Sequence, residues 1–300
     1  MNSLRCETVG LVLHFRDGQR TARCLDSLRR DGIRKVLLVD NSQDAGASLS
    51  ALSGRLQAWE ASGLDIRVEQ PATNLGFSAG ANLGLRAIRE WHGHACVLLL
   101  NSDAELRPGA SAAMRAALPQ EPPAVAAACM LDRRGEATPY AYYQRVSGLL
   151  TRHRLPGAHR YLSGCCLMIH PGLAVGDLFD EDFFFYGEDI ELGWRMMNLG
   201  MNQIAVAGAF VDHEGSAGSR NGSLFYEYHM AMAHLRLPAK LYRSATARLA
   251  PTLVRCITLP ARATTRALRF RSVAPWLGLV LALFDLVARH RRDLTPLAPD

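Results

Sequence analysis

The order of apolar and polar positions divides the first half of the chain into alternating strands and helices. Short apolar runs predict buried strands of a parallel sheet, and these runs are Val9–Phe15, Val36–Val39, Ile66–Val68 and Cys96–Leu100. Between them, Leu25 and Leu28 have helical spacing in a segment that ends near Gly32, and Leu49–Ala61 is also helix-like. This alternation predicts an α/β fold with an open, mostly parallel sheet and right-handed crossovers.

The second half of the chain is less regular. Apolar runs predict three further strands, Ala124–Met130, Tyr161–Ile169 and Gln203–Val206. The segment Asp132–His159 is rich in basic residues, tyrosine, glycine and proline, and we expect it to be a mobile loop outside the core. After about Leu224 the chain becomes helical, apolar and rich in arginine.

The charge of the chain lies in this last part. From Lys240 onward there are 11 basic and 3 acidic residues, whereas residues 1–239 carry 23 basic and 25 acidic ones, for a net charge of +6. A basic tail indicates an anionic surface, and no nucleic-acid motif accompanies it, so we expect no nucleic-acid partner. We divide the chain into a domain over residues 1–235 and a basic helical region over 236–300.

The most apolar part of this region is Pro275–Phe284. It is shorter than the ~20 residues that a membrane-spanning helix needs, and Asp285 ends it. Two interpretations stay open, an interfacial helix on a membrane and a helix packed on the domain.

The cysteines and the amino terminus indicate a cytoplasmic protein. The seven cysteines are odd in number and scattered, and no CxxC pair occurs. They predict small buried hydrophobic residues in a reducing compartment, with neither a disulfide nor a zinc site. The segment Met1–Glu7 is polar and the following apolar run is too short for a signal peptide.

Polar residues follow two of the predicted strands directly. Asp40 comes after the second strand and Asn101-Ser102-Asp103 after the fourth. Ligands of open α/β sheets bind beyond the carboxyl ends of the strands, so these side chains are candidates for a binding site. Mg²⁺ takes few protein oxygens when phosphate and water fill its other positions. Asp103 with a nitrogen of His213 would complete such a partial shell, although His213 alone is more typical of a hydrogen-bonded structural histidine.

Two further stretches combine glycine, aromatic and acidic residues. In Asn74–Gly84 a glycine recurs every fourth position, which permits close approach to a neighbouring backbone or a ligand but fits no phosphate-loop motif. In Phe183–Arg195 an aromatic run and Gly187 precede Glu188, Asp189 and Glu191. These carboxylates are either functional or simply an acidic start of an amphipathic helix.

In this order the motifs resemble those of family 2 glycosyltransferases with the GT-A fold, and most closely the rhamnosyltransferase-like branch. The resemblance covers roughly residues 8–235, and its motifs are Val39–Ser42, Asn74–Gly84, Asn101–Asp103, Gly187–Arg195 and His213–Gly215. It implies a nucleotide-diphospho-sugar transferase with a Rossmann-like, mostly parallel sheet, to which the C-terminal helices form an appendage.

The resemblance also implies roles for individual residues. Asp189 would be the general base, Glu188 its neighbour or substitute, and Arg195 would orient the carboxylate. Asp103 and His213 would bind Mg²⁺ or Mn²⁺, although Asn101 replaces the first Asp of the usual D-x-D element. The acceptor would meet Ser163, Gly164, Phe185, Tyr186 and Trp194. The donor would meet His14, Phe15, Arg16, Asp40, Asn41, Asn74, Gly76, Phe77, Asn82, Asn101 and Ser102.

The implied reaction is single displacement with inversion, in which a carboxylate takes the proton of an acceptor hydroxyl. By resemblance the donor would be dTDP-rhamnose, and the acceptor a saccharide or lipid-linked saccharide of bacterial surface polysaccharide at the cytoplasmic face of the inner membrane. The peripheral membrane surface and a homodimer are the further partners that we consider. Two alternatives remain, a nucleotidyltransferase, for which Arg16-Asp17-Gly18 is a poor triphosphate loop, and a non-catalytic nucleotide-sugar-binding module.

Overall fold

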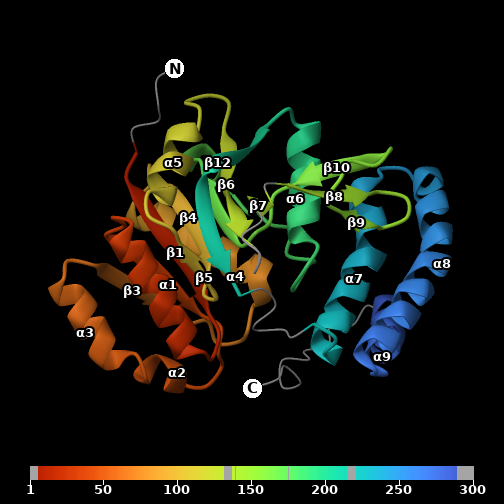
Figure 1. The fold of residues 1–300 in the computed structure, drawn as a ribbon, viewed down its shortest axis with the longest axis horizontal. Coiled ribbons are helices and arrows are strands. Elements are labelled where there is room, and N and C mark those ends of the chain that lie inside the picture. Colours follow the sequence, from red (N-terminus) through yellow and green to blue (C-terminus); the bar gives the residue numbers. More distant parts are fainter. Residues whose placement is uncertain (1–5, 132–136, 139, 175, 215–220, 289–300) are drawn as a thin grey trace.

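The computed structural model describes residues 6–131, 137–138, 140–174, 176–214 and 221–288, and it confirms the α/β architecture (Figure 1). Within these residues one main sheet has nine strands in the order β3-β2-β1-β4-β11-β6-β12-β5, with β7 paired to β6. Strands β3, β2, β1 and β4 are parallel, and β11 lies antiparallel between β4 and β6. The strands are β1 Thr8–His14, β2 Lys35–Asp40, β3 Asp65–Glu69, β4 Cys96–Asn101, β5 Ala104–Leu106, β6 Ala124–Leu131, β7 Ala137–Thr138, β11 Cys166–Ile169 and β12 Asn202–His213.

Helices cover both faces of this sheet because successive strand residues point to opposite sides. Leu98 belongs to a hydrophobic cluster with Leu25 of α1, whereas the next residue, Leu99, belongs to a cluster with Leu85 of α4. Helices α1, α3 and α5 therefore lie on one face, and α4 and α6 on the other. The helices of this part are α1 Gly18–Arg30, α2 Ala47–Ser50, α3 Ser53–Ala61, α4 Gly76–Trp91, α5 Ala110–Ala117, the 3₁₀ turn η1 Pro171–Leu173, and α6 Glu188–Asn198.

The expectation of an irregular loop over residues 132–159 is wrong for its described part. Strands β8 (Ala141–Gln144), β9 (Leu150–Thr151) and β10 (Ala158–Tyr161) form a second, antiparallel sheet. Its Tyr143 is fully buried in a cluster with residues of α6 and α7. The short strands are covered by elements from distant parts of the sequence, so local composition did not predict them. Residues 132–136 and 139 lie outside the described part of the chain.

The single strand expected at residues 161–169 is also wrong. The chain leaves β10 at Tyr161 and enters β11 at Cys166, and these two strands belong to different sheets. The break falls at Ser163 and Gly164, where the chain passes the carboxyl end of β4. The apolar run is continuous because both strands are buried, so its pattern did not reveal the break.

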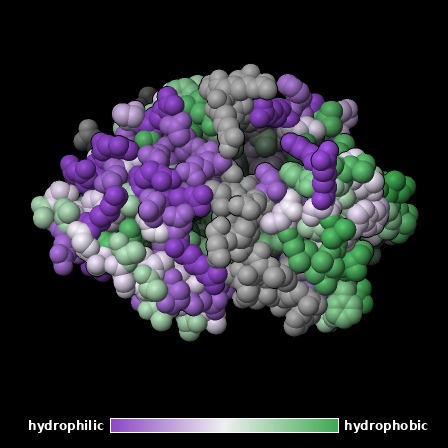
Figure 2. Space-filling model, turned by 60° about the horizontal axis from the view of Figure 1, so that its bottom comes forward, coloured by the Kyte–Doolittle hydropathy of each residue, from purple (hydrophilic) through white to green (hydrophobic). Residues whose placement is uncertain are grey.

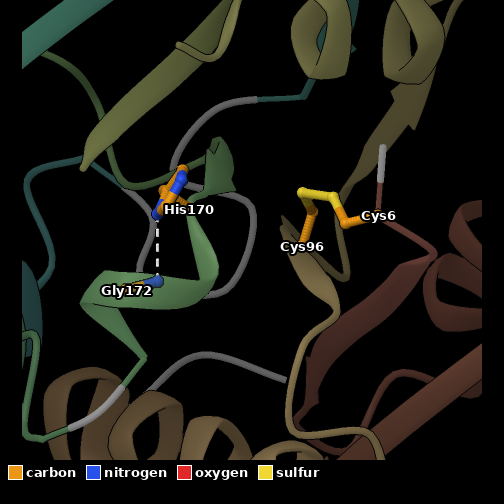
Figure 3. The surroundings of a disulfide bond; sticks show 4 residues. All are labelled: Cys6, Cys96, His170 and Gly172. Atoms are coloured by element: carbon orange, nitrogen blue, oxygen red, sulfur yellow. Dashed lines mark hydrogen bonds between the residues drawn. A yellow bond between two sulfur atoms is a disulfide. The ribbon is translucent and has the colours of Figure 1, made fainter. Parts of the chain in front are cut away.

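A disulfide joins Cys6 and Cys96, which corrects the expectation that all cysteines are reduced (Figure 3). The two residues are 90 positions apart in the sequence, and their Cα atoms are 5.9 Å apart. Strands β1 and β4 are parallel neighbours with Thr8 opposite Cys96, so the amino ends of these strands lie side by side. The cysteines are brought together by strand pairing, so the disulfide could not be predicted from their spacing along the sequence.

Three C-terminal helices pack together beside the main sheet (Figure 1). They are α7 Leu224–Leu241, α8 Ala245–Phe270 and α9 Ala274–Ala288, and the boundary that we expected at residue 235 lies inside α7. A cluster that includes Phe225, Leu259 and Leu279 joins the three helices. In the part of the chain that the structure describes, no helix has the length and apolar character needed to cross a membrane.

We predict that Gly193→Ala destabilises the protein by about 1–3 kcal/mol, because α6 lies too close to β10 for a side chain. A Cβ atom at Gly193 would lie 2.5 Å from Cβ of Tyr161 and 3.0 Å from the carbonyl oxygen of Arg160. Urea unfolding measures the change. Gly54→Ala in α3, where a Cβ atom meets nothing within 4 Å, is the control and should be neutral or stabilising. Equal unfolding curves for the Gly193 variant and the wild type would contradict the close packing.

Candidate active site

A pocket of about 300 Å³ opens beyond the carboxyl ends of β1 and β4. Its floor comes from the ends of these strands, including His14 and Asn101, and from the start of α4. The acidic start of α6 and the first turn of α7 complete its walls. The strand-end placement is the one that the alternating pattern predicted for a ligand site.

Asp103 and His213 form a pair on one side of the pocket. Strand β12 pairs with β5 so that His213 lies opposite Ala104, and this register brings Nε2 of His213 to 3.2 Å from Oδ1 of Asp103. Burial raises the pKa of Asp103, but the hydrogen bond and charge of His213 outweigh it and hold the pKa below its usual range. The described residues contain no group of three His, Cys, Asp or Glu side chains arranged to hold a metal ion. A carboxylate and an imidazole nonetheless fit a cation that takes its remaining ligands from phosphate and water.

Glu188 and Asp189 begin α6 and line the same pocket. Tyr186 and Gly187 both have positive φ angles, 66° and 96°, and this sharp turn places the carboxylates at the amino end of the helix. Burial raises the pKa of Asp189 to about 7, although backbone N–H groups including that of Gly164 donate to it and lower the value. Burial and the neighbouring Asp189 raise the pKa of Glu188 well above its usual range. With a pKa near neutral pH, Asp189 can accept a proton there, as a general base must.

Aromatic rings line the wall beside these carboxylates. Phe184, Phe185 and Tyr186 from the loop before α6 face the pocket together with Phe225 from α7. The rings of Phe185 and Phe225 lie 5.6 Å apart, and Tyr186 makes an edge contact with Tyr226 at 5.1 Å. Aromatic rings that line a pocket offer apolar faces against which the apolar face of a sugar ring can pack.

Asp40 and His14, two of the residues expected to meet the donor, make hydrogen bonds within the protein. The carboxylate of Asp40 accepts hydrogen bonds from Ser42 N at 3.0 Å and from Nε2 of Gln70 at 3.1 Å. His14 is fully buried between Thr21 and Ser48, and burial lowers its pKa. These bonds hold the two side chains beside the strand ends, and they bring the carboxylate of Asp40 next to the amide of Gln70.

Most of the predicted site residues line this one pocket. They are His14, Phe15, Asn41, Asn74, Gly76, Phe77, Asn101, Ser102, Asp103, Ser163, Gly164, Phe185, Tyr186, Glu188, Asp189 and His213.

Five predicted residues do not line the pocket. Arg16 bonds to Ser42, and Asp40 lies behind the surface as described above. Asn82 holds the loop at Phe179 through two backbone hydrogen bonds. Trp194 packs against His159 and Arg145, and Arg195 pairs with Glu191 and bonds to the carbonyl of Leu178. The geometry of Asn82, Trp194 and Arg195 is that of residues that support the site from outside the pocket.

Sequence reasoning missed several residues of the pocket, among them Arg20 and Phe225. Arg20 lies on the first turn of α1, where its Nε is 2.9 Å from Glu214 and a terminal nitrogen is 2.9 Å from Asp17. Among the described residues that line the pocket it is the one lysine or arginine. Along the sequence it is indistinguishable from a surface arginine, and Phe225 from an ordinary core residue of a helix.

Comparison with known proteins was consistent with this geometry. The family model described as glycosyl transferase family 2 matches residues 9–174, more than half of the chain. The low-salt glycan biosynthesis hexosyltransferase Agl10 of Haloferax volcanii is 29% identical over 196 residues. That match covers 60% of this chain and 60% of the relative, so the chain spans about three-fifths of the relative's length.

Solved structures share the fold at low sequence identity. GalNAc-T7 with UDP, GalNAc and Mn²⁺ is similar with a TM-score of 0.56 at 15% identity, over 98% of this chain and 59% of that one. The mannosyltransferase PcManGT from Pyrobaculum calidifontis with GDP-Man and Mn²⁺ has a TM-score of 0.55 at 16% identity, over 96% and 89%. These likenesses concern the fold.

We predict that Asp189→Asn stabilises the folded protein at about pH 8, by about 1–4 kcal/mol relative to wild type. A carboxyl group with a raised folded-state pKa contributes stability below its unfolded pKa and loses it as pH rises through about 7. The advantage of the variant should therefore vanish below about pH 4. Denaturant unfolding as a function of pH measures it, and the exposed Glu60→Gln variant is the control. A constant difference across this range would contradict a buried, protonated Asp189.

Proposed function

Since the chain belongs to glycosyl transferase family 2, we propose that it is an inverting glycosyltransferase that moves a sugar from a nucleotide-diphosphate donor to an acceptor hydroxyl. One observation carries the proposal. A single pocket is lined both by the pair Asp103 and His213 and by the buried carboxyl groups of Glu188 and Asp189. A displacement with inversion needs a group that stabilises the leaving diphosphate and a base on the opposite face of the sugar.

The side of Asp103 and His213 would receive the diphosphate. These two residues would hold Mg²⁺ or Mn²⁺, which when bound neutralises the charge that develops on the leaving group. Arg20 lies next to this pair and lowers the pKa of Asp103 through its charge. We propose that the guanidinium of Arg20 turns from Glu214 and Asp17 to the diphosphate, because it is the permanent cation of the described lining.

The side of Asp189 would receive the acceptor. As the acceptor oxygen bonds to the anomeric carbon, the bond from that carbon to the diphosphate breaks and the diphosphate keeps the electron pair. Asp189 takes the proton of the hydroxyl in the same step, and a pKa of about 7 suits a base that works near neutral pH. Glu188, whose Oε2 is buried without a hydrogen-bond partner among the described residues, would hold the pair's other proton. The rings of Phe185, Tyr186 and Phe225 would support the acceptor sugar.

The finer identity of the substrates rests on the resemblance of the motifs. By this resemblance the donor is dTDP-rhamnose, and the acceptor is a saccharide or lipid-linked saccharide of bacterial surface-polysaccharide synthesis. By the same resemblance Asp40, whose carboxylate bonds to the amide of Gln70 at 3.1 Å, would hydrogen-bond the nucleobase. A pyrimidine imide, which presents one N–H between two carbonyls, matches this pair.

The proposal is tested by measuring nucleoside-diphosphate release from a panel of sugar nucleotides with Mg²⁺ or Mn²⁺ present. We expect turnover of at least one donor, dTDP-rhamnose first, and its loss with a chelator. Release of pyrophosphate from a nucleoside triphosphate and sugar phosphate would indicate a nucleotidyltransferase instead. Nucleotide binding without turnover on any donor would leave only a binding module.

We predict that Asp189→Asn lowers the transfer rate by about 10²–10⁴-fold, because it removes the group that takes the acceptor proton. Donor affinity should stay within about twofold, since Asp189 is proposed to contact the acceptor and not the donor. Steady-state kinetics with a donor-binding titration measure both effects. If transfer persists in this variant, Asp189 is not the base and Glu188 becomes the candidate.

We predict that Arg20→Gln raises the Michaelis constant for the donor about tenfold, the effect of losing one charged hydrogen bond. Arg23→Gln is the matched control because Arg23 also pairs with Glu214 but does not line the pocket. It should change the constant by less than about twofold. Equal effects of the two variants would mean that Arg20 acts only by holding Glu214.

A further inference from the structure

Helix α9 has a buried face and an exposed apolar face. Gly278, Leu279 and Ala282 pack against the neighbouring helices, and a Cβ atom at Gly278 would lie 2.7 Å from the backbone of α7. The opposite side of the helix exposes large apolar side chains at spacings of three and four residues. They are Trp276 (42% exposed), Val280 (56%), Phe284 (62%) and Val287 (84%).

Helix α8 repeats this arrangement. Its buried stripe faces α7 and α9, and its outward stripe consists of Leu249, Leu253, Ile257 and Leu268, which are 59–75% exposed. Figure 2 shows hydrophobic residues gathered on the side of the molecule where the C-terminal helices lie. We call these two stripes the α8–α9 apolar surface. Large apolar side chains that gather on one side of a folded protein in this way indicate an interaction site.

The charged residues of α8 and α9 indicate what kind of partner would bind this surface. Residues 245–288 contain six arginines and a single carboxylate, Asp285. Asp285 is fully buried and accepts a hydrogen bond from Tyr228, so it contributes no negative charge to the surface. Arg262 and Arg266 pair with the buried Glu227, whereas Arg269 and Arg271 lie exposed at the turn between the two helices.

An anionic lipid surface fits these features. Its acyl boundary receives apolar side chains, and its phosphates attract arginines. A second copy of this chain would bring the same excess of arginine to the contact, and like charges would oppose each other across it. The charge pattern therefore favours lipid over self-association.

We infer that α8 and α9 form a docking surface for an anionic membrane, with the apolar surface at the boundary of the acyl chains and the exposed arginines on lipid phosphates. The cluster of Phe225, Leu259 and Leu279 lies between this surface and the aromatic wall of the pocket, where Phe184 and Phe185 pack against it. Docking would hold the acceptor side of the pocket one helix layer from the lipid. The inference does not depend on the transferase chemistry, because binding to lipid is measured without turnover.

The experiment uses the full chain and vesicles of phosphatidylcholine, with and without phosphatidylglycerol. We expect flotation with the anionic vesicles, weaker binding at high salt, and a blue shift of Trp276 fluorescence that Trp276→Phe removes. Absence of binding to anionic vesicles at low salt would overturn the inference.

Two pairs of variants locate the contact. Val280→Ser with Phe284→Ser should weaken vesicle binding at least about tenfold, since two exposed apolar side chains are lost. The control is Met197→Ser with Leu199→Ser, at positions 45% and 62% exposed at the end of α6, and it should leave binding unchanged. Thermal unfolding should be alike for both, because all four positions are exposed. Equal vesicle binding by the two double variants would overturn the assignment.

Charge is tested in the same way. Arg269→Gln with Arg271→Gln should lower affinity about tenfold or more on anionic vesicles, at about fivefold for each arginine. Arg55→Gln, in α3, is the control. If the arginine substitutions leave the affinity for anionic vesicles unchanged, the surface does not recognise the charge of the lipid.

The inference would also be overturned if the α8–α9 apolar surface were covered by another part of the protein or by a second copy of it. Sedimentation velocity showing a dimer that Val280→Ser with Phe284→Ser dissociates would assign the surface to a second copy. Deletion of residues 289–300 that increases quenching of Trp276 by acrylamide, without vesicles, would assign it to the chain's own end. If vesicle binding holds but no sugar nucleotide is turned over, the proposed function fails and the membrane surface stands.

Discussion

The site depends on the close contact between Gly76 and Phe184. The N–H of Phe77 donates to the carbonyl oxygen of Phe184 at 2.8 Å, and a Cβ atom at Gly76 would lie 2.3 Å from that oxygen. Gly76 also has a φ of 73°, which a side chain would strain. This contact joins the start of α4, on the proposed donor side, to the loop that carries the carboxylates. Without it the two halves of the pocket would not face each other.

The C-terminal helices complete the pocket from the other side. Phe225 comes from the first turn of α7, and α7 is anchored by Glu227, which is fully buried and paired with Arg262 and Arg266 of α8. A buried carboxylate needs such partners, so the position of the aromatic wall depends on α8. The region that looked like an appendage is thus part of the architecture of the site.

Much of the candidate site was predictable because strand ends are readable from a sequence. The apolar runs before Asp40 and Asp103 predicted which residues emerge at the carboxyl edge of the sheet, and the resemblance supplied Asp189 and His213. Arg20, Phe225 and the small sheet around Tyr143 were not predictable. Their positions depend on packing between segments that are far apart in the chain. The local pattern of apolar and polar residues does not encode this packing.

By itself the sequence determined the alternation of strands and helices and the acidic start of α6, because these follow from periodicity and local backbone preference. It also determined the excess of arginine near the C-terminus. The tertiary structure decided which cysteines meet, as Cys6 and Cys96 do across neighbouring strands. It decided that Trp194 and Arg195 lie outside the pocket, and that His213 meets Asp103 through the register of β12 on β5. Each of these is a long-range contact. It contributes to the free energy of folding only after distant elements have packed together.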